Sequence, residues 1–283
     1  MKYRMLAIDL DGTLFDSRGR IPEANREAIA RARDDGLLVV PCTGRALKEA
    51  QWALEELGHD TPAVLAGGAH VSDPTTGQTL YRVTVEPNLA LDVVRSLRES
   101  GHAVLILLDP EITGDDYLVV DDDRLTPNTR WWFESIGARV KPLAEPTEAD
   151  LHHALRVGIV GESDAMPDVQ TMLTDRFAEH VFVQHFQAVG DHNERINVLE
   201  VFAKGVNKWS GLHWVAESHG FDAAEVAAIG DEINDLAMIE SAGCGIAMGN
   251  AIPAVRDVAR RVTRSNDEGG VAHAIKHLLD GRW

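Results

Sequence analysis

Short apolar runs alternate with helix-like segments in the first third of this chain, and this alternation most restricts the fold. Mainly apolar side chains occupy residues 4–8, 37–42 and 62–66, as expected for buried strands. Residues 21–35 and 46–57 lie between these runs and carry the pattern of helices. Strand–helix–strand units of this kind form right-handed crossovers. The sequence therefore predicts an α/β fold built on a parallel sheet.

The pattern changes in the middle of the chain and then returns. Residues 70–85 predict a hairpin around an Asp-Pro-Thr-Thr-Gly turn. Strands and helices follow in a mixed order, and the alternating scheme resumes with strands expected at residues 197–201 and 226–229. We therefore expect a core of residues 1–84 and 191–283, interrupted by an inserted α+β module of residues 85–190.

The charge balance limits the partners of the protein. The chain carries 45 Asp and Glu against 27 Lys and Arg, a formal net charge of -18. This field repels nucleic acid and anionic membranes, so we expect neither as a partner. It also repels an anionic substrate. A phosphate site in this chain must therefore be made locally positive by a metal ion, a lysine or backbone amides.

The cysteines and the apolar runs predict a cytoplasmic protein. Cys42 and Cys244 each lie in an apolar stretch without CxxC spacing, which favours buried free thiols in a reducing compartment. The apolar run at residues 5–8 is too short for a secretory signal. No stretch approaches the length of a membrane span.

The sharpest local signal is the hexapeptide Asp-Leu-Asp-Gly-Thr-Leu at residues 9–14, directly after the first strand. Ligands of parallel sheets bind beyond the carboxyl ends of strands, so Asp9 points at the expected site. The turn at Gly12 frees Asp11 to approach the same place. One carboxylate could then attack phosphorus while the other protonates the leaving oxygen. The alternative is that both residues merely cap the turn.

Two further segments suit an anion. Thr43 and Gly44 follow the second strand and precede a helix, where a hydroxyl and a backbone amide form an anion pocket. An ordinary helix cap explains Thr43 equally well. Lys208 opens a predicted helix, where the dipole disfavours a cation unless an anion lies nearby. A solvated surface lysine is the alternative reading of Lys208.

A fourth segment, Gly-Asp-Glu-Ile-Asn-Asp at residues 230–235, follows the strand at residues 226–229. Asp231, Asp235 and Asn234 offer hard oxygen ligands of the kind that Mg²⁺ prefers. A helix-capping cluster is the alternative. Because all four segments follow strands of one predicted sheet, we expect them to converge at one edge as a phosphate and metal site.

These four segments together resemble the motifs of the haloacid dehalogenase superfamily, in the expected order across both halves of the core. The stretch at residues 245–251 is also similar to the segment that follows in the Cof-type branch. The resemblance implies a Rossmann-like core with an inserted α/β cap. It also implies a Mg²⁺-dependent phosphatase that hydrolyses small phosphate monoesters, such as sugar phosphates, through an aspartyl-phosphate.

The resemblance also implies a role for each residue. Asp9 would be the nucleophile and Asp11 the general acid and base. For phosphate binding, the resemblance implies Thr43, Gly44, Lys208 and Asn234. For Mg²⁺, it implies Asp9, the Asp11 carbonyl, Asp231 and Asp235. Asp235 would either ligate through water or brace its loop.

Other readings of the same residues stay open at this point. A phosphomutase shares the aspartyl-phosphate chemistry, and a non-catalytic phosphate-binding regulator could keep the same pocket. A dehalogenase is disfavoured, because such enzymes lack the second aspartate and Asp11 is present. One departure from the family concerns residues 66–69, Ala-Gly-Gly-Ala, where many relatives have Asn-Gly-Ala. We expect an amide contact to be missing there.

Overall fold

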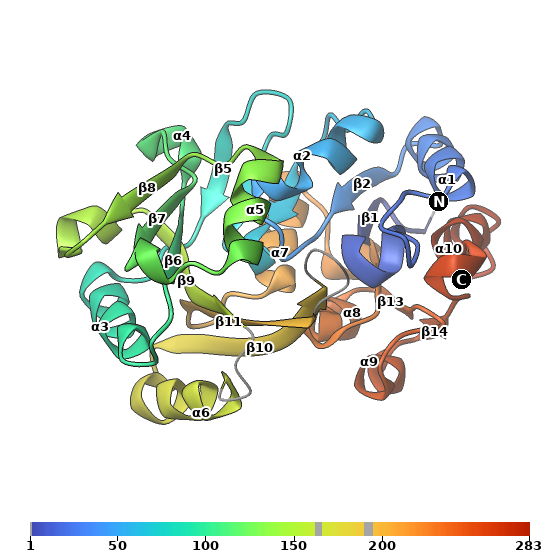
Figure 1. The fold of residues 1–283 in the computed structure, drawn as a ribbon. Coiled ribbons are helices and arrows are strands. Elements are labelled where there is room, and N and C mark those ends of the chain that lie inside the picture. Colours follow the sequence, from blue (N-terminus) through green and yellow to red (C-terminus); the bar gives the residue numbers. More distant parts are fainter. Residues whose placement is uncertain (1, 162–165, 190–194) are drawn as a thin grey trace. The chain divides into compact units, whose positions relative to one another are not determined.

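The chain forms two compact units, which are described separately. The computed structural model describes residues 2–161, 166–189 and 195–283 (Figure 1). The first unit consists of Met1–Tyr81 and Asn207–Trp283, and the second unit of Arg82–Val206. The second unit is thus an insertion in the first. This division lies after Tyr81 and Val206, whereas the sequence analysis placed the boundaries after residues 84 and 190.

A five-stranded parallel sheet is the centre of the first unit and confirms the predicted α/β class. Its strand order is β14-β13-β12-β1-β2. The strands are β1 (Met5–Ile8), β2 (Leu38–Pro41), β12 (Val226–Gly230), β13 (Cys244–Ala247) and β14 (Arg261–Val262). Ile8 pairs with Ile229 on one side and with Pro41 on the other. The carboxyl ends of β12, β1 and β2 therefore lie level at one edge of the sheet.

The expected third strand pairs differently from the prediction. It is β3 (Ala63–Leu65), which joins β4 (His70–Ser72) and β5 (Thr79–Arg82) in a separate three-stranded sheet. β3 pairs antiparallel with β4, and a single parallel bridge, Cys42 to Val64, connects it to the end of β2. The predicted hairpin at residues 70–85 is confirmed as β4 and β5.

Six helices surround these sheets in the first unit. They are α1 (Glu23–Asp34), α2 (Leu47–Glu56), α7 (Lys208–Ser218), α8 (Leu236–Ser241), α9 (Pro253–Val258) and α10 (Gly270–Leu279). Helix α1 packs against α10, and α7 packs against β3 and α8. Tyr81 stacks on Trp214 of α7 with the ring centroids 5.3 Å apart. This contact joins the two chain segments that flank the insertion.

The second unit contains a six-stranded mixed sheet with the order β10-β11-β9-β6-β7-β8. All neighbours are antiparallel except β7 and β8. Its strands are β6 (Val104–Leu108), β7 (Tyr117–Val120), β8 (Val140–Leu143), β9 (Ala154–Gly161), β10 (Val181–Val189) and β11 (Arg195–Ala203); its helices are α3 (Pro87–Arg98), α4 (Pro110–Thr113), α5 (Pro127–Ile136) and α6 (Met166–Phe177).

The two faces of this mixed sheet have different neighbours. Helices α3 and α6 pack on one face and share its apolar core. Side chains alternate between the faces of a strand, so Tyr117 points away from that core while Leu118 points into it. The Tyr117 ring packs against Trp132 and Phe133 of α5, with centroids 5.7 Å and 5.0 Å away.

One strand was assigned to the wrong sheet by the sequence analysis. We expected residues 197–201 to return to the parallel core, but they lie within β11 of the mixed sheet. β11 pairs antiparallel with both β10 and β9. Its apolar alternation predicts a strand correctly, but the partner of a strand depends on distant residues, which a local pattern does not contain.

The length and apolar character of the helices can be compared with those of a membrane span. Among the residues that the structure describes, none of the helices has the length and apolar character needed to cross a bilayer.

Candidate active site

Asp9 lies directly after β1, at the level edge of the parallel sheet. Its backbone N–H donates to the Ile229 carbonyl at 3.1 Å, so it still belongs to the sheet, and its side chain is buried. The chain then turns sharply through Leu10–Leu14. Gly12 has φ +76°, and a Cβ there would lie 2.3 Å from Oδ2 of Asp231. Only glycine therefore lets the turn approach the neighbouring strand end.

Asp231 follows β12 and is held by residues from two other segments. The Thr13 hydroxyl donates to its Oδ1 at 2.8 Å. The Asn250 amide donates to its Oδ2 at 3.2 Å and to the Gly12 carbonyl at 2.8 Å. Asn250 thus connects the Asp231 loop with the Asp9 turn. The sequence analysis gave no role to Thr13 or Asn250, although Asn250 lies in the stretch at residues 245–251 that resembles the Cof-type branch, and that signal could have found it.

Lys208 lies at the centre of the site and is not the surface lysine of the alternative reading. Its side chain is 1% exposed at the first position of α7. Its Nζ donates to Oδ1 of Asp9 and to Oδ1 of Asp235, both at 2.6 Å, and to Asn234 Oδ1 at 3.4 Å. Burial alone would lower the pKa of Lys208, but Asp235 and Asp9 together raise it above its usual value. The two carboxylates therefore favour the charged ammonium.

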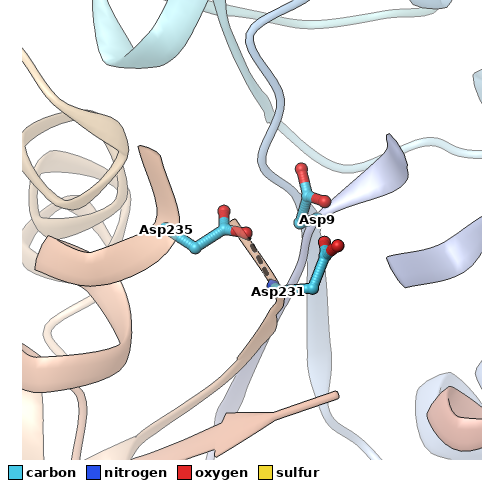
Figure 2. Close-up of side chains that lie close together, drawn as sticks. All are labelled: Asp9, Asp231 and Asp235. Atoms are coloured by element: carbon cyan, nitrogen blue, oxygen red, sulfur yellow. Dashed lines mark hydrogen bonds between the residues drawn. The ribbon is translucent and has the colours of Figure 1, made fainter. Parts of the chain in front are cut away.

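Asp235 is fully occupied by partners inside the protein. Its Oδ2 accepts from the backbone N–H groups of Asp231 and Glu232 at 2.8 and 3.1 Å, while Oδ1 accepts from Lys208. Figure 2 shows the first of these bonds as a dashed line. A Cβ on Gly230 would lie 2.5 Å from the Asp235 carboxyl carbon. These contacts make Asp235 the residue that shapes the loop after β12.

Three carboxylates converge at this edge. Asp9, Asp231 and Asp235 each offer an oxygen within 4.8 Å of the others, and their side chains point toward one another in Figure 2. Burial, with the nearby Asp235 carboxylate, raises the pKa of Asp9 well above its usual value. Burial and Asp235 likewise raise the pKa of Asp231 to about 7. Three acids against one lysine leave excess negative charge, which a bound divalent cation would neutralise.

Thr43 and Gly44 lie at the end of the neighbouring strand β2. The Thr43 side chain is buried, and its Oγ1 accepts from the Arg45 N–H at 3.1 Å. The Thr43 N–H donates to the Val64 carbonyl at 2.9 Å. A Cβ on Gly44 would lie 3.9 Å from the Asn234 amide nitrogen. The structure therefore brings Thr43, Gly44, Lys208 and Asn234 to the same edge as Asp9.

The loop after β3 departs from the family pattern. Ala66 has φ +48°, a left-handed conformation that asparagine adopts more easily than alanine. Its N–H donates to the Arg45 carbonyl at 2.8 Å, and the Gly67 N–H donates to the Thr43 carbonyl at 3.0 Å. The backbone of this loop therefore supports the segment of residues 43–45.

Asp11 lies apart from the other acids. Its side chain is 57% exposed, and it is not in the group of three converging carboxylates. Both of its oxygens accept from Arg45: Oδ2 from Nε at 2.8 Å and Oδ1 from Nη2 at 2.7 Å. The site as a whole thus contains a buried nucleophile candidate, a fixed lysine, a candidate cation site and a second carboxylate at its exposed rim.

Comparison with known proteins agrees with this geometry. Residues 6–275 match the family model described as haloacid dehalogenase-like hydrolase. The chain is 32% identical to the 5-amino-6-(5-phospho-D-ribitylamino)uracil phosphatase YitU of Bacillus subtilis, with 98% of each chain covered. It is 27% identical to the pyridoxal phosphate phosphatase YbhA of Escherichia coli, covering 99% of this chain and 100% of the relative.

The fold has a solved counterpart as well. A haloacid dehalogenase-like hydrolase from Bacteroides thetaiotaomicron superposes with a TM-score of 0.79 at 26% identity, covering 98% of this chain and 100% of that one. The family match spans both segments of the first unit and the whole insertion. The resemblance drawn from the sequence motifs is therefore confirmed: this chain belongs to the haloacid dehalogenase-like hydrolases.

Proposed function

We propose that this protein hydrolyses small phosphate monoesters, sugar phosphates among them, in a Mg²⁺-dependent reaction through an aspartyl-phosphate on Asp9. The observation that carries the proposal is the state of the Asp9 carboxylate. Lys208 holds Oδ1 at 2.6 Å, and no hydrogen bond to Oδ2 is found within the described residues. One oxygen is thus fixed while the other is available for attack on phosphorus.

In the first half of the proposed reaction, Oδ2 of Asp9 forms a bond to phosphorus and the bond from phosphorus to the leaving oxygen breaks. Asp11 gives its proton to that oxygen, so the alcohol leaves neutral. In the second half, Asp11 takes a proton from a water molecule that attacks the phosphorus. The bond between phosphorus and Asp9 breaks, and inorganic phosphate leaves. Both half reactions require the Asp11 side chain to reach the exposed rim of the site. Its exposed position allows this.

The phosphoryl oxygens need donors, and the residues around Asp9 supply them. Lys208 contributes a buried ammonium whose charge is fixed by two carboxylates. The Thr43 hydroxyl, the Gly44 backbone N–H and the Asn234 amide come from the neighbouring strand ends. Donors fixed in advance stabilise developing charge without reorganising, which is the main source of catalysis in phosphoryl transfer.

The acidic cluster fits a magnesium ion. We assign Asp9, Asp231 and the Asp11 backbone carbonyl as its ligands. Asp235 instead braces the loop, because both of its oxygens already accept hydrogen bonds from the protein. Asn250 and Thr13 orient Asp231, and such supporting contacts tune metal affinity. When bound, Mg²⁺ would neutralise charge on the acids and on the phosphoryl group.

The substrate class follows from charge and from the relatives. The two curated relatives described above are named for phosphate esters of small molecules, a ribitylaminouracil and pyridoxal. A net charge of -18 disfavours polyanions such as nucleic acid. We therefore propose a small phosphorylated metabolite as the substrate. The cytoplasmic location stays a prediction from the sequence.

The test measures phosphate release from a panel of sugar, polyol, pyridoxal and nucleotide phosphates, with and without Mg²⁺. We expect release by the wild type to require Mg²⁺ and to be abolished in Asp9→Asn. Asp92→Asn is the control, because it makes the same substitution at an exposed, ion-paired aspartate outside the site. Acid-quenched wild type should carry phosphate on the peptide that contains Asp9.

Two outcomes would reject the proposal. Full Mg²⁺-dependent turnover by Asp9→Asn would exclude Asp9 as the nucleophile. Turnover that appears only with a bisphosphate activator, and that moves the phosphoryl group without releasing it, would identify a phosphomutase instead.

A further inference from the structure

Asp11 is an exposed side chain whose orientation is set by a single neighbour. The proposed function gives Asp11 both proton transfers, yet its side chain is 57% exposed. An exposed aspartate normally samples several rotamers. Within the described part of the chain, the side-chain partner of Asp11 is Arg45, which donates to both carboxylate oxygens at 2.8 and 2.7 Å. Arg45 therefore decides where this carboxylate lies.

Arg45 is itself held firmly by its surroundings. Its backbone N–H donates to the Thr43 hydroxyl at 3.1 Å, and its carbonyl accepts from Ala66 at 2.8 Å. Its guanidinium lies over the buried Phe15 ring at 5.6 Å from the centroid. Phe15 in turn stacks on Trp52 with the centroids 5.0 Å apart. The arginine thus extends from a fixed backbone across a fixed aromatic surface.

The connection runs from the phosphate-binding segment to the catalytic turn. Thr43 and Arg45 belong to one loop, and Asp11 belongs to the turn after β1. A planar guanidinium that donates through two nitrogens fixes both the position and the plane of a carboxylate, which a lysine ammonium cannot do. Resting on the proposed function, we propose that Arg45 is a positioning residue that places the Asp11 carboxylate for proton transfer at the leaving oxygen.

The pairing has a chemical consequence for the cycle. While both oxygens accept from Arg45, neither can direct an O–H toward the guanidinium. Proton transfer therefore requires one Asp11 oxygen to release its contact with Arg45, while the other oxygen still accepts from the guanidinium and keeps the carboxylate in place. The bidentate pair lets one contact open without losing the position of the group.

The test compares wild type, Arg45→Ala and Arg45→Lys in Mg²⁺-dependent hydrolysis of the best alkyl phosphate from the panel. We expect kcat of Arg45→Ala to fall about tenfold, less than the 10²- to 10⁴-fold expected for losing the acid itself. KM should stay within about twofold, because the substrate loses no contact. Arg45→Lys should recover part of kcat.

Three controls separate positioning from other roles. Arg20→Ala removes another Arg–Asp pair of the first unit, with Asp16, and should leave both constants unchanged. Mg²⁺ affinity measured by calorimetry should be the same in Arg45→Ala and wild type. In an Asp11→Asn background, assayed at raised enzyme concentration, Arg45→Ala should cause no further loss, because its effect passes through Asp11.

Clear results would overturn the inference. A raised KM with unchanged kcat would mean that Arg45 contacts the substrate. An equal loss from Arg45→Ala in the Asp11→Asn background would mean that Arg45 acts independently of Asp11. A wild type without phosphate release would reject the proposed function and this inference together, whereas the ratios between variants test Arg45 alone.

Discussion

Both units of this protein bury charged side chains, but they balance those charges differently. In the first unit, Asp9, Asp231 and Asp235 gather around the single ammonium of Lys208. In the second unit, two buried carboxylates are each paired with an arginine. Arg156 pairs with Glu200, and Arg82 donates to Asp109 at 2.7 Å.

The difference separates the candidate active site from a structural cluster. The pair in the mixed sheet is complete: Gln184 donates to Glu200 at 2.6 Å, and Arg156 donates to the Tyr117 hydroxyl at 3.0 Å. The acids of the first unit lack enough positive charge to balance them. Burial and mutual repulsion therefore raise the pKa of both Asp9 and Asp231. Unbalanced buried charge of this kind marks a site that gains stability from a ligand.

The largest effect is expected from Lys208→Met. Removing the ammonium leaves Asp9 and Asp235 without their shared cation, and a phosphoryl group without its donor. We expect turnover to fall about 10³-fold, and the free energy of unfolding to fall by about 3 kcal/mol. Steady-state assays measure the turnover, and chemical denaturation measures the free energy of unfolding. Unchanged stability without metal would mean that the lysine does not offset the acids.

In the second unit, the expected effect is on stability rather than on metal binding. Arg156→Met leaves a buried Glu200 carboxylate unpaired and should lower the free energy of unfolding by about 3 kcal/mol. The double variant Arg156→Met with Glu200→Gln removes the lone charge and should recover part of this loss. Mg²⁺ affinity, measured by calorimetry, should not change in either. A double variant less stable than the single one would contradict the interpretation of a matched pair.

The last prediction concerns pH. The pKa of Asp231 is raised from 3.8 to about 7 in the folded protein, so the folded state holds a proton that the unfolded chain has lost. Without Mg²⁺, this residue's contribution to stability is therefore present below about pH 3.8 and is lost as the pH rises toward 7. Thermal denaturation of wild type and Asp231→Asn across this range isolates the contribution. A wild type that gains stability relative to Asp231→Asn as the pH rises would show the opposite sign.

The sequence predicted the parallel sheet and the convergence of the four motifs because both depend on local order. A strand, a turn and a polar cluster are adjacent in sequence, and parallel strands align their carboxyl ends whatever lies between them. Asp9, Thr43, Gly44, Asn234, Asp231 and Asp235 were placed at one edge by this reasoning. Lys208 was placed there because residues 197–201 were expected in the same sheet, which is wrong; it reaches the edge as the first residue of α7. The structure brings them together there.

Contacts between distant side chains could not be predicted in the same way. The Arg45–Asp11 pair spans 34 residues, and the Asn250–Gly12 contact spans 238. Each depends on side-chain directions that are fixed only after the sheet has formed. The assignment of β11 failed for the same reason, because its pairing with β9 and β10 is a property of the insertion as a whole.

The bond between Lys208 and Asp9 joins residues 199 positions apart, and this separation has a consequence for synthesis on the ribosome. The nucleophile candidate emerges early, but β1 lies between β2 and β12, and β12 begins at Val226. While the insertion is being translated, Asp9 therefore has neither Lys208 nor the strand β12 beside it. Chains that terminate within the insertion hold the motif that identifies the family but not the geometry that phosphoryl transfer requires.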